Sequence, residues 1–336
     1  MAATNRRLVL ASRPAGEPST ENFRLETGAV PEAGEGEMLV ENLYLSIDPY
    51  MRGRMSDRES YAKPVDIGEV MVGGTVGRVI ASKAPGFEVS DLVVGYGGWQ
   101  DYAVFAGSSR QVLKVDPDLP PSTALGVCGM PGVTAYFGLF KLGEPKAGET
   151  VVVSAASGGV GSVVGQLARL HGCRVVGIAG GPEKCAYVTD ELGFDACVDH
   201  RAANLADALR SACPKGVDVY FENVGGKVLE AVAPLLNTGA RVPICGFISQ
   251  YNAAEPVTPF TVLGALPNPP FHRFFLVWEW PEEYASAVSE LTRHVKQGKL
   301  RYREDVSVGL EAAPEALRDV LRGKNFGKKV VKLASG

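Results

Sequence analysis

The stretch of residues 150–170, TVVVSAASGGVGSVVGQLARL, constrains the fold of this chain more than any other part. Its β-branched beginning, residues 150–154, predicts a strand buried on both faces, because such strands lose the alternation of polar and apolar residues. A turn of small residues follows, and an apolar-periodic segment then extends to His171. Strand, small-residue turn and helix, in this order, are the context that a dinucleotide-binding fingerprint requires.

The turn is our predicted pyrophosphate site. Small residues let the backbone turn sharply and approach a pyrophosphate closely, and the helix N-terminus supplies free N–H groups and partial positive charge. The motif reads A-x-x-G-x-x-G rather than G-x-G-x-x-G. The alternative to a dinucleotide-binding turn is therefore an ordinary glycine-rich turn between a strand and a helix. The next hundred residues repeat the same architecture, which favours dinucleotide binding. The predicted contacts are Ala155, Gly158, Gly159, Val160 and Gly161.

Length and charge exclude several classes of protein. A chain of 336 residues is long enough for about two domains. The formal net charge of −4 excludes bulk electrostatic attraction to nucleic acid or to an anionic membrane. No apolar run is long enough for a signal peptide or a membrane span. We therefore expect a cytoplasmic protein with no nucleic-acid or membrane partner.

Cysteine and histidine usage argues against a disulfide framework and against a metal site. The six cysteines, at positions 128, 173, 185, 197, 213 and 245, contain no C-x-x-C pair. Five of them fall inside predicted α/β elements, which is typical of reduced, mostly buried thiols. The four histidines do not cluster in the sequence. We expect no bound metal.

The chain divides into a β-rich part and an α/β part. Short β-rich runs at 37–45, 70–81, 92–94 and 100–105, punctuated by glycine and proline, predict a small curved β unit. From residue 122, predicted strands (150–154, 174–179, 196–198, 217–223, 240–245 and an aromatic strand at 274–278) alternate with helices. This alternation predicts a doubly wound parallel sheet of the α/β class.

The end of the chain returns to β character, with a final predicted strand at 329–333. A terminal piece this short cannot bury a core of its own. We therefore expect residues 299–336 to complete the N-terminal unit. The predicted domains are 1–121 with 299–336, and 122–298.

The second strand of the α/β part indicates which nucleotide is bound. An NAD site usually carries an acid at the end of this strand. Here the strand ends Gly177-Ile178-Ala179-Gly180-Gly181-Pro182, with no acid. Lys184 lies just beyond it, and the pair His200-Arg201 ends the third strand. A missing carboxylate with cations nearby favours NADP, although Lys184 alone can also be a solvated lysine.

Six sequence motifs, taken together, resemble those of one protein family. The chain is similar to the zinc-independent medium-chain dehydrogenase/reductases, and especially to the leukotriene dehydrogenase / prostaglandin reductase branch of NADPH-dependent double-bond reductases. The matching motifs span nearly the whole chain in the family's order: DPYMR (48–52), MPGVTAY (130–136), AASGGVG (155–161), ENVGG (222–226), CGFISQYN (245–252) and NFGK (325–328). Their collinearity is far more specific than any one motif.

The resemblance implies a GroES-like β-barrel domain for the substrate, a Rossmann domain for NADPH, and a role for each matching residue. Lys184 would contact the cofactor's 2′-phosphate, and Tyr251 would reach the nicotinamide ribose. The other implied cofactor contacts are Gly180, Asn223, Cys245 and Asn325. The branch often has a tyrosine beside the 2′-phosphate where this chain has His200, whose imidazole can serve instead. Zinc-dependent relatives need an early Cys and a nearby His, and this chain has no Cys before 128 and no His before 171.

Our hypothesis for the reaction is hydride transfer from NADPH to the β-carbon of an α,β-unsaturated ketone or aldehyde. Negative charge then develops on the carbonyl oxygen, and without a metal, hydrogen-bond donors must stabilise it. The candidate catalytic residues are Tyr50 and Tyr251. Tyr50 can instead pack against the barrel rim, and Tyr251 can be a structural ring on its turn. The α-carbon proton can come from solvent or from a tyrosine.

The predicted substrate contacts are Tyr50, Arg52, Met130 and Phe271. Phe271 is part of an apolar wall after the proline-rich loop. The nearby residues 274–278 suit a buried core or the contact of a homodimer equally well. Two other functions remain open: an NADPH-dependent quinone reductase on the same fold, and a non-catalytic NADPH-binding protein.

Overall fold

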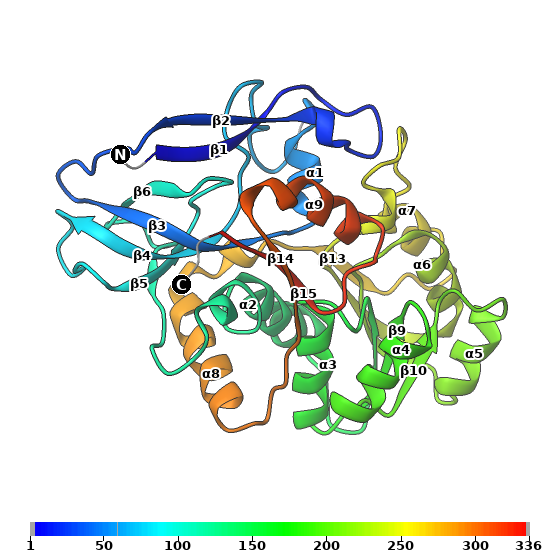
Figure 1. The fold of residues 1–336 in the computed structure, drawn as a ribbon. Helices are drawn as coiled ribbons and strands as arrows, with labels where there is room; N and C mark the ends of the chain where they lie inside the picture. The colour runs from blue at the N-terminus through cyan, green and yellow to red at the C-terminus, as the bar shows by residue number, and fades with distance from the viewer. Residues whose placement is uncertain (1–3, 59, 334–336) are drawn as a thin grey trace. The chain divides into compact units, whose positions relative to one another are not determined.

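The computed structural model describes residues 4–58 and 60–333, which fall into two compact units. The first, here the β unit, comprises Met1–Gly126 and Glu304–Gly336, and the second, the nucleotide unit, comprises Val127–Arg303 (Figure 1). The first unit is thus built from both ends of the chain. The sequence had predicted unit boundaries at 121/122 and 298/299.

The nucleotide unit is built on a parallel sheet of six strands in the order β10-β9-β8-β11-β12-β13. In order of appearance along the chain this is 3-2-1-4-5-6, the order of a doubly wound dinucleotide-binding sheet. The predicted α/β fold class is therefore confirmed. The strands are β8 (Thr150–Ser154), β9 (Arg174–Ala179), β10 (Ala196–Asp199), β11 (Val217–Phe221), β12 (Leu236–Ile244) and β13 (Phe271–Phe274).

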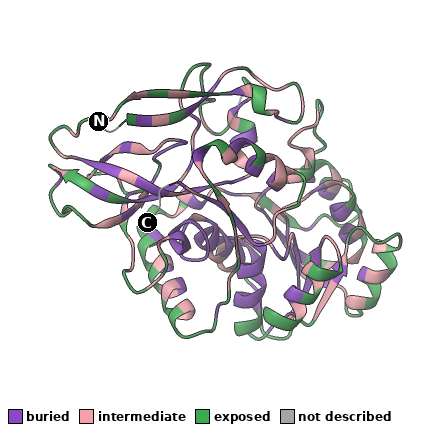
Figure 2. Cartoon of the chain, in the orientation of Figure 1, coloured by how far each residue is buried: buried purple, intermediate pink, exposed green. Residues whose placement is uncertain are grey.

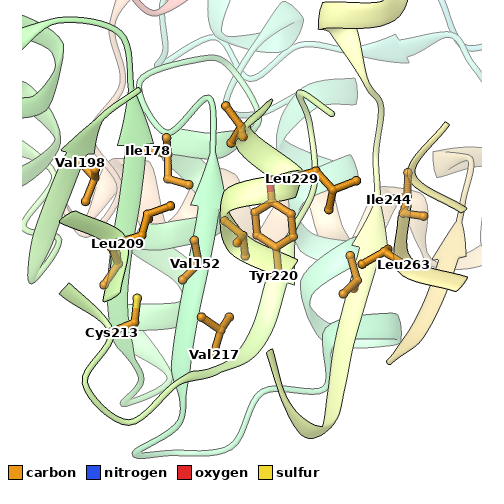
Figure 3. Packing of buried hydrophobic residues seen from close by; sticks show 14 residues of the cluster. Val152, Ile178, Val198, Leu209, Cys213, Val217, Tyr220, Leu229, Ile244 and Leu263 are labelled. Carbon is orange, nitrogen blue, oxygen red and sulfur yellow. The ribbon is translucent and has the colours of Figure 1, made fainter. Parts of the chain in front are cut away.

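Helices cover both faces of this sheet, which explains its continuous apolar strands. On one face, Val152, Ile178 and Tyr220 pack in a single cluster with residues of α5, α6 and α7 (Figure 3). On the other face, α3 packs against β8 and β9. The central strands are therefore buried and are largely purple in Figure 2. The helices of this unit are α2 (Met130–Phe137), α3 (Gly161–Leu170), α4 (Pro182–Ala186), α5 (Leu205–Ala212), α6 (Gly226–Val232), α7 (Pro259–Gly264) and α8 (Tyr284–Lys296).

The predicted aromatic strand at 274–278 was wrong in position. Strand β13 covers Phe271–Phe274 instead, with Phe274 opposite Ile244 of β12. The chain then enters a turn in which the Leu276 N–H donates to Glu279 Oε1 at 2.8 Å. The aromatic residues beyond the strand pack on other rings: Phe275 lies edge-on to Phe221, and Trp278 stacks on Tyr284. Their aromatic character thus reflects ring packing rather than strand pairing.

The β unit contains a seven-stranded sheet and a separate hairpin. Six of the strands follow the order β14-β15-β3-β4-β5-β7, and β6 pairs with β3. The terminal strand β15 is antiparallel to β3, so the end of the chain does join the N-terminal sheet. The strands are β1 (Thr4–Leu10), β2 (Phe23–Ala29), β3 (Glu37–Ser46), β4 (Thr75–Ser82), β5 (Leu92–Gly95), β6 (Tyr102–Ala106), β7 (Leu113–Lys114), β14 (Glu304–Val308) and β15 (Lys328–Lys332), with helices α1 (Tyr50–Arg54) and α9 (Ala313–Leu321).

The hairpin of β1 and β2 was not predicted from the sequence. Both strands carry several charged residues, and only the end of β1, from Leu8 to Leu10, is continuously buried. Such strands give a weak periodic signal. Within residues 4–58 and 60–333, no helix has the length and apolar character needed to cross a membrane.

Candidate active site

The turn between β8 and α3 has the geometry of a phosphate-binding loop. Ala155, where the consensus has glycine, adopts φ +51°, a left-handed conformation that glycine reaches without strain. A Cβ at Gly161 would lie 2.4 Å from the Ala155 carbonyl oxygen, so only glycine fits there. The Gly158 N–H donates to that same oxygen at 2.9 Å. The small residues are therefore required by the turn, which leads directly into the ten-residue helix α3. The N–H groups of Ser162 and Val163 donate to the carbonyls of Gly158 and Val160, so the partial positive charge of the helix N-terminus is the feature that suits an anion.

Three basic side chains come together after β9 and β10. A Cβ on Gly180 would lie 2.8 Å from His200 Nε2 and 3.1 Å from Arg201 Nε, so both side chains lie over this glycine. Desolvation, followed by the positive charge of Arg201, lowers the pKa of His200, and the charge of Lys184 adds to this effect. Lys184 is therefore close enough to act on the same ring. Arg201 was noted in the sequence but not included among the predicted contacts.

The nearest acid in this cluster is engaged by the backbone. Asp199 Oδ1 accepts from the Gly181 N–H at 2.8 Å and from the Arg201 N–H at 2.9 Å. These backbone hydrogen bonds hold the pKa of Asp199 below its usual value. The Asp199 carboxylate thus stabilises the turn. Basic groups outnumber acids in this cluster, so the cluster suits a phosphate better than the two hydroxyls of a ribose.

Asn223 is held at the carboxyl end of β11. Its Nδ2 donates to the Ser154 carbonyl at 2.7 Å, and its N–H donates to Ser154 Oγ at 2.8 Å. These bonds tie the ends of β8 and β11 together. Asn223 is therefore placed beside the turn of residues 155–161, and its role toward the cofactor stays a prediction.

Glu222, which the sequence analysis did not single out, organises the turn after Asn223. It is fully buried, and its Oε1 accepts from the N–H groups of Val224 at 2.6 Å and Gly225 at 3.0 Å. The hydroxyls of Ser154 and Tyr220 also donate to it. Burial raises the pKa of Glu222 despite these donors. In the sequence Glu222 lies near the end of the predicted strand at 217–223 and begins the ENVGG motif, but no role was predicted for it.

Cys245 and Tyr251 follow β12 at the same edge of the sheet. The Cys245 N–H donates to the Glu222 carbonyl at 2.9 Å, and desolvation raises the pKa of the Cys245 thiol to about 12. A Cβ on Gly246 would lie 2.7 Å from the Tyr251 hydroxyl and 3.9 Å from the Asn223 carbonyl oxygen. The missing side chain at Gly246 therefore makes room for the Tyr251 hydroxyl near Asn223. The predicted cofactor contacts of this unit thus follow the carboxyl ends of β8, β9, β10, β11 and β12.

In the β unit, Tyr50 begins helix α1, just after strand β3. Its hydroxyl oxygen is buried and has no hydrogen-bond partner among the described residues. Desolvation and the nearby charge of Asp48 raise the pKa of Tyr50 well above its ordinary value. Tyr50 is therefore protonated at neutral pH and offers a hydrogen-bond donor that no described residue accepts.

A buried ion pair fixes the segment that leads to Tyr50. Lys328 Nζ, on β15, donates to Asp48 Oδ1 at 2.9 Å and to the Ile47 carbonyl at 2.7 Å. Ser46 Oγ donates to the other carboxylate oxygen. Lys328 also closes the NFGK motif, in which Asn325 Nδ2 donates to the Gly327 carbonyl at 2.8 Å. The pair thus links the DPYMR segment to the segment that carries Asn325.

The remaining predicted substrate contacts are placed less favourably. Arg52 is buried and its Nε donates to the Gly16 carbonyl at 2.9 Å, so its guanidinium already has a structural partner. Met130 begins α2, where its carbonyl accepts from Thr134 Oγ1. Phe271 is 53% exposed and lies at the first residue of β13, away from the carboxyl end of the sheet. The structure does not bring Phe271 to the residues around Tyr251.

NADPH, a group with a pyrophosphate and a 2′-phosphate, fits the features of the nucleotide unit. The turn before α3 leaves no room for a Cβ at Gly161, and His200 and Arg201 lie over Gly180, with the charge of Lys184 acting on His200. For a metal ion, no three His, Cys, Asp or Glu side chains gather within residues 4–58 and 60–333. Independence from zinc stays a prediction.

Comparison with known proteins identifies the family. One family profile, described as the N-terminal domain of oxidoreductase, matches residues 6–115, and another, described as zinc-binding dehydrogenase, matches residues 159–268. The chain is 52% identical to the NADPH-dependent curcumin reductase of Escherichia coli K12, over 98% of this chain and 97% of that protein. It is 43% identical to prostaglandin reductase 1 of Rattus norvegicus, over 94% and 95% of the two chains.

A solved structure agrees with these relatives. The crystal structure of CurA from Vibrio vulnificus in complex with NADPH shares 52% identity with this chain and superposes with a TM-score of 0.92. The match covers 98% of this chain and 100% of that chain. The chain therefore belongs to the medium-chain dehydrogenase/reductase family, in the branch of the prostaglandin reductases, and it is an NADP-dependent oxidoreductase whose cofactor is NADPH.

Proposed function

We propose that the protein reduces the carbon–carbon double bond of α,β-unsaturated ketones and aldehydes. The observation that carries the proposal is the buried Tyr50 hydroxyl, a donor without an acceptor among the described residues. A buried donor without a partner is costly, and a substrate oxygen can supply the missing acceptor. The names of the curcumin reductase and prostaglandin reductase relatives support the same class of substrate, because curcumin is a conjugated diketone.

The bound cofactor supplies hydride for the β-carbon of the substrate. Tyr50 donates a hydrogen bond to the substrate carbonyl oxygen, where negative charge develops. Its raised pKa keeps the proton on the phenol at neutral pH, so the donor is always present. One such donor contributes on the order of 3 kcal/mol to the stability of the transition state.

The cofactor would be held by the carboxyl edge of the parallel sheet. The residues 155–161 would contact the pyrophosphate, and Lys184, His200 and Arg201 the 2′-phosphate. Asn223 would hydrogen-bond the cofactor, and Tyr251 would orient the nicotinamide ribose. In the β unit, Asn325 is a further proposed contact. Glu222 acts through the turn it holds and is a positioning residue.

The test compares Tyr50→Phe with the wild type on a simple enone. NADPH oxidation is followed by absorbance, the product is identified by mass spectrometry, and deuterated NADPH reports which carbon receives hydride. We expect a saturated ketone, deuterium on the β-carbon, and a kcat about 100-fold lower in Tyr50→Phe. The Kd for NADPH should not change.

Two results would contradict the proposal. An allylic alcohol as the product would mean that the carbonyl is reduced instead of the double bond. Turnover of quinones without turnover of enones would favour the quinone reductase alternative. Tyr251→Phe serves as a second variant, because its hydroxyl is proposed to act on the ribose and its loss should lower kcat more moderately.

A further inference from the structure

Two cysteines of the nucleotide unit lie in contact beside the cluster of basic residues. Cys185 is on α4 and Cys197 is on β10, and their Sγ atoms are 3.1 Å apart. Both thiols are free and half-buried. They are twelve positions apart in the sequence, so the contact arises from the packing of α4 on β10.

The position of this pair connects it to the 2′-phosphate cluster. Cys185 directly follows Lys184, and its N–H donates to the Gly181 carbonyl at 3.2 Å. Cys197 lies two residues before Asp199, which holds the turn that carries His200 and Arg201. A covalent change at the two sulfur atoms therefore acts on both elements that carry the basic groups.

We propose that Cys185 and Cys197 form an oxidation site, at which a hydroperoxide converts the dithiol to a disulfide and so weakens the binding of a 2′-phosphate at Lys184 and His200. The inference rests on NADPH as the cofactor and on the proposed roles of these two residues. It does not depend on which substrate is reduced.

The contact also assigns the order of the two steps. The Cys197 thiol donates to Cys185 Sγ, which favours the Cys185 thiolate. Cys185 attacks the hydroperoxide: an S–O bond forms, the O–O bond breaks, and an alcohol leaves. Cys197 then attacks the resulting sulfenic sulfur, the S–S bond forms, and water leaves. Two thiols and one hydroperoxide thus give one disulfide, one alcohol and one water.

Burial sets the rate of this reaction. Desolvation raises the pKa of both thiols, and that of Cys197 most strongly. The thiolate is the reactive form, so oxidation is slow at neutral pH and accelerates as the pH rises. The charge that faces the pair comes from Asp199 on β10, and it raises the pKa of both thiols further.

The geometry explains why oxidation affects the phosphate cluster. A disulfide bond is about 2.0 Å long, so the sulfur atoms must approach by about 1 Å. Helix α4 begins at Pro182 and continues directly into the helical segment Tyr187–Glu191. Lys184 directly precedes Cys185 on α4, so a shift of the backbone at Cys185 displaces Lys184 as well. By thermodynamic reciprocity, a ligand with a 2′-phosphate favours the dithiol over the disulfide at equilibrium. A bound 2′-phosphate also holds Lys184 and His200 in place, so we expect it to slow the approach of the two sulfur atoms.

The test treats the full-length protein with tert-butyl hydroperoxide in the presence of NADP⁺, of NAD⁺ or of neither. Non-reducing peptide mapping follows the formation of a peptide that links residues 185 and 197, and dithiothreitol reverses it. We expect NADP⁺ to slow the formation of this peptide at least fivefold and NAD⁺ to have little effect. Calorimetry should show a Kd for NADP⁺ about tenfold higher in the oxidised protein, because a charge-assisted hydrogen bond is lost.

Matched variants separate this site from the other thiols. Two serine variants, Cys185→Ser and Cys197→Ser, should bind NADP⁺ equally before and after peroxide treatment. The alanine variants Cys185→Ala and Cys197→Ala, which add no hydroxyl, should behave in the same way. Cys173→Ser and Cys213→Ser should behave like the wild type. Failure to find the linked peptide at pH 9 would overturn the proposal. A disulfide that leaves the Kd for NADP⁺ unchanged would overturn the coupling to the 2′-phosphate.

Discussion

Replacing Lys328 by methionine should destabilise the β unit strongly. Lys328 and Asp48 are 7% and 9% exposed, and their 2.9 Å contact is supported by the bond from Lys328 to the Ile47 carbonyl. Methionine fills a similar volume but leaves the Asp48 carboxylate buried with the Ser46 hydroxyl as its remaining side-chain donor. Breaking a buried ion pair from one side costs about 3–5 kcal/mol of the free energy of unfolding.

Lys329→Met is the matched control, one residue further along the same strand. Lys329 pairs with Asp305, whose side chain is 30% exposed, so water solvates the carboxylate once the lysine is gone. We expect this control to cost about 1 kcal/mol or less, as is usual for partly exposed pairs. Urea unfolding, followed by circular dichroism, measures both losses.

A double-mutant cycle tests the reasoning directly. Asp48→Asn removes the charge that Lys328 compensates, so the Asp48→Asn/Lys328→Met double variant should cost less than the sum of the two single losses by at least about 1.5 kcal/mol. Additive losses would refute a direct interaction. A loss in Lys328→Met no larger than that in Lys329→Met would refute the importance of burial.

Three further predictions concern the nucleotide unit. Gly180→Ala places a Cβ 2.8 Å from His200 Nε2, so we expect the Kd for NADP⁺ to rise about tenfold and the Kd for NAD⁺ to stay constant. Calorimetry measures both constants. An equal loss of affinity for the two nucleotides would contradict a 2′-phosphate site at His200. The pKa of His200 is lowered by desolvation and by Arg201, and a bound phosphate must raise it, so binding takes up a proton. As the pH falls from 7.5 to 5.5, the affinity of the wild type for NADP⁺ should therefore increase relative to the affinity of the His200→Gln variant. Affinities of the two proteins that change in parallel with pH would contradict this prediction. Gly165→Ala puts a Cβ 1.8 Å from the Phe194 ring and should lower the free energy of unfolding, measured in urea, by about 1–3 kcal/mol. The double variant Gly165→Ala/Phe194→Leu should recover part of this loss. A single variant as stable as the wild type would show that the Phe194 ring moves aside without cost.

Local patterns were sufficient to predict most of the nucleotide unit. Strands β8 and β9 were predicted with the bounds that the structure has, because both are short, continuous apolar runs followed by small residues. The turn at 155–161 was predicted from small residues, and its left-handed Ala155 shows why the fingerprint normally has glycine there. The family and the cofactor NADPH are confirmed by the relatives.

Contacts between distant residues could not be predicted in this way. The pair Asp48–Lys328 joins residues 280 positions apart, and the contact of Cys185 with Cys197 depends on how α4 packs on β10. Neither has a periodic signal. The roles of Tyr50, Tyr251 and the other site residues stay predictions, since they depend on groups that bind to the folded chain.

The position of β15 determines the order in which the protein can mature on the ribosome. Residues 127–303 form one uninterrupted unit and can fold once they have emerged. The first 126 residues are synthesised earlier and contain β4 and β6, which pair with β3. The end of β3, residues 44–46, lacks its partner until Lys328–Lys332 has been translated. During that interval this end of β3 presents an unpaired edge, the kind of surface that chaperones cover. The part of the chain that is made first is therefore the part that finishes folding last.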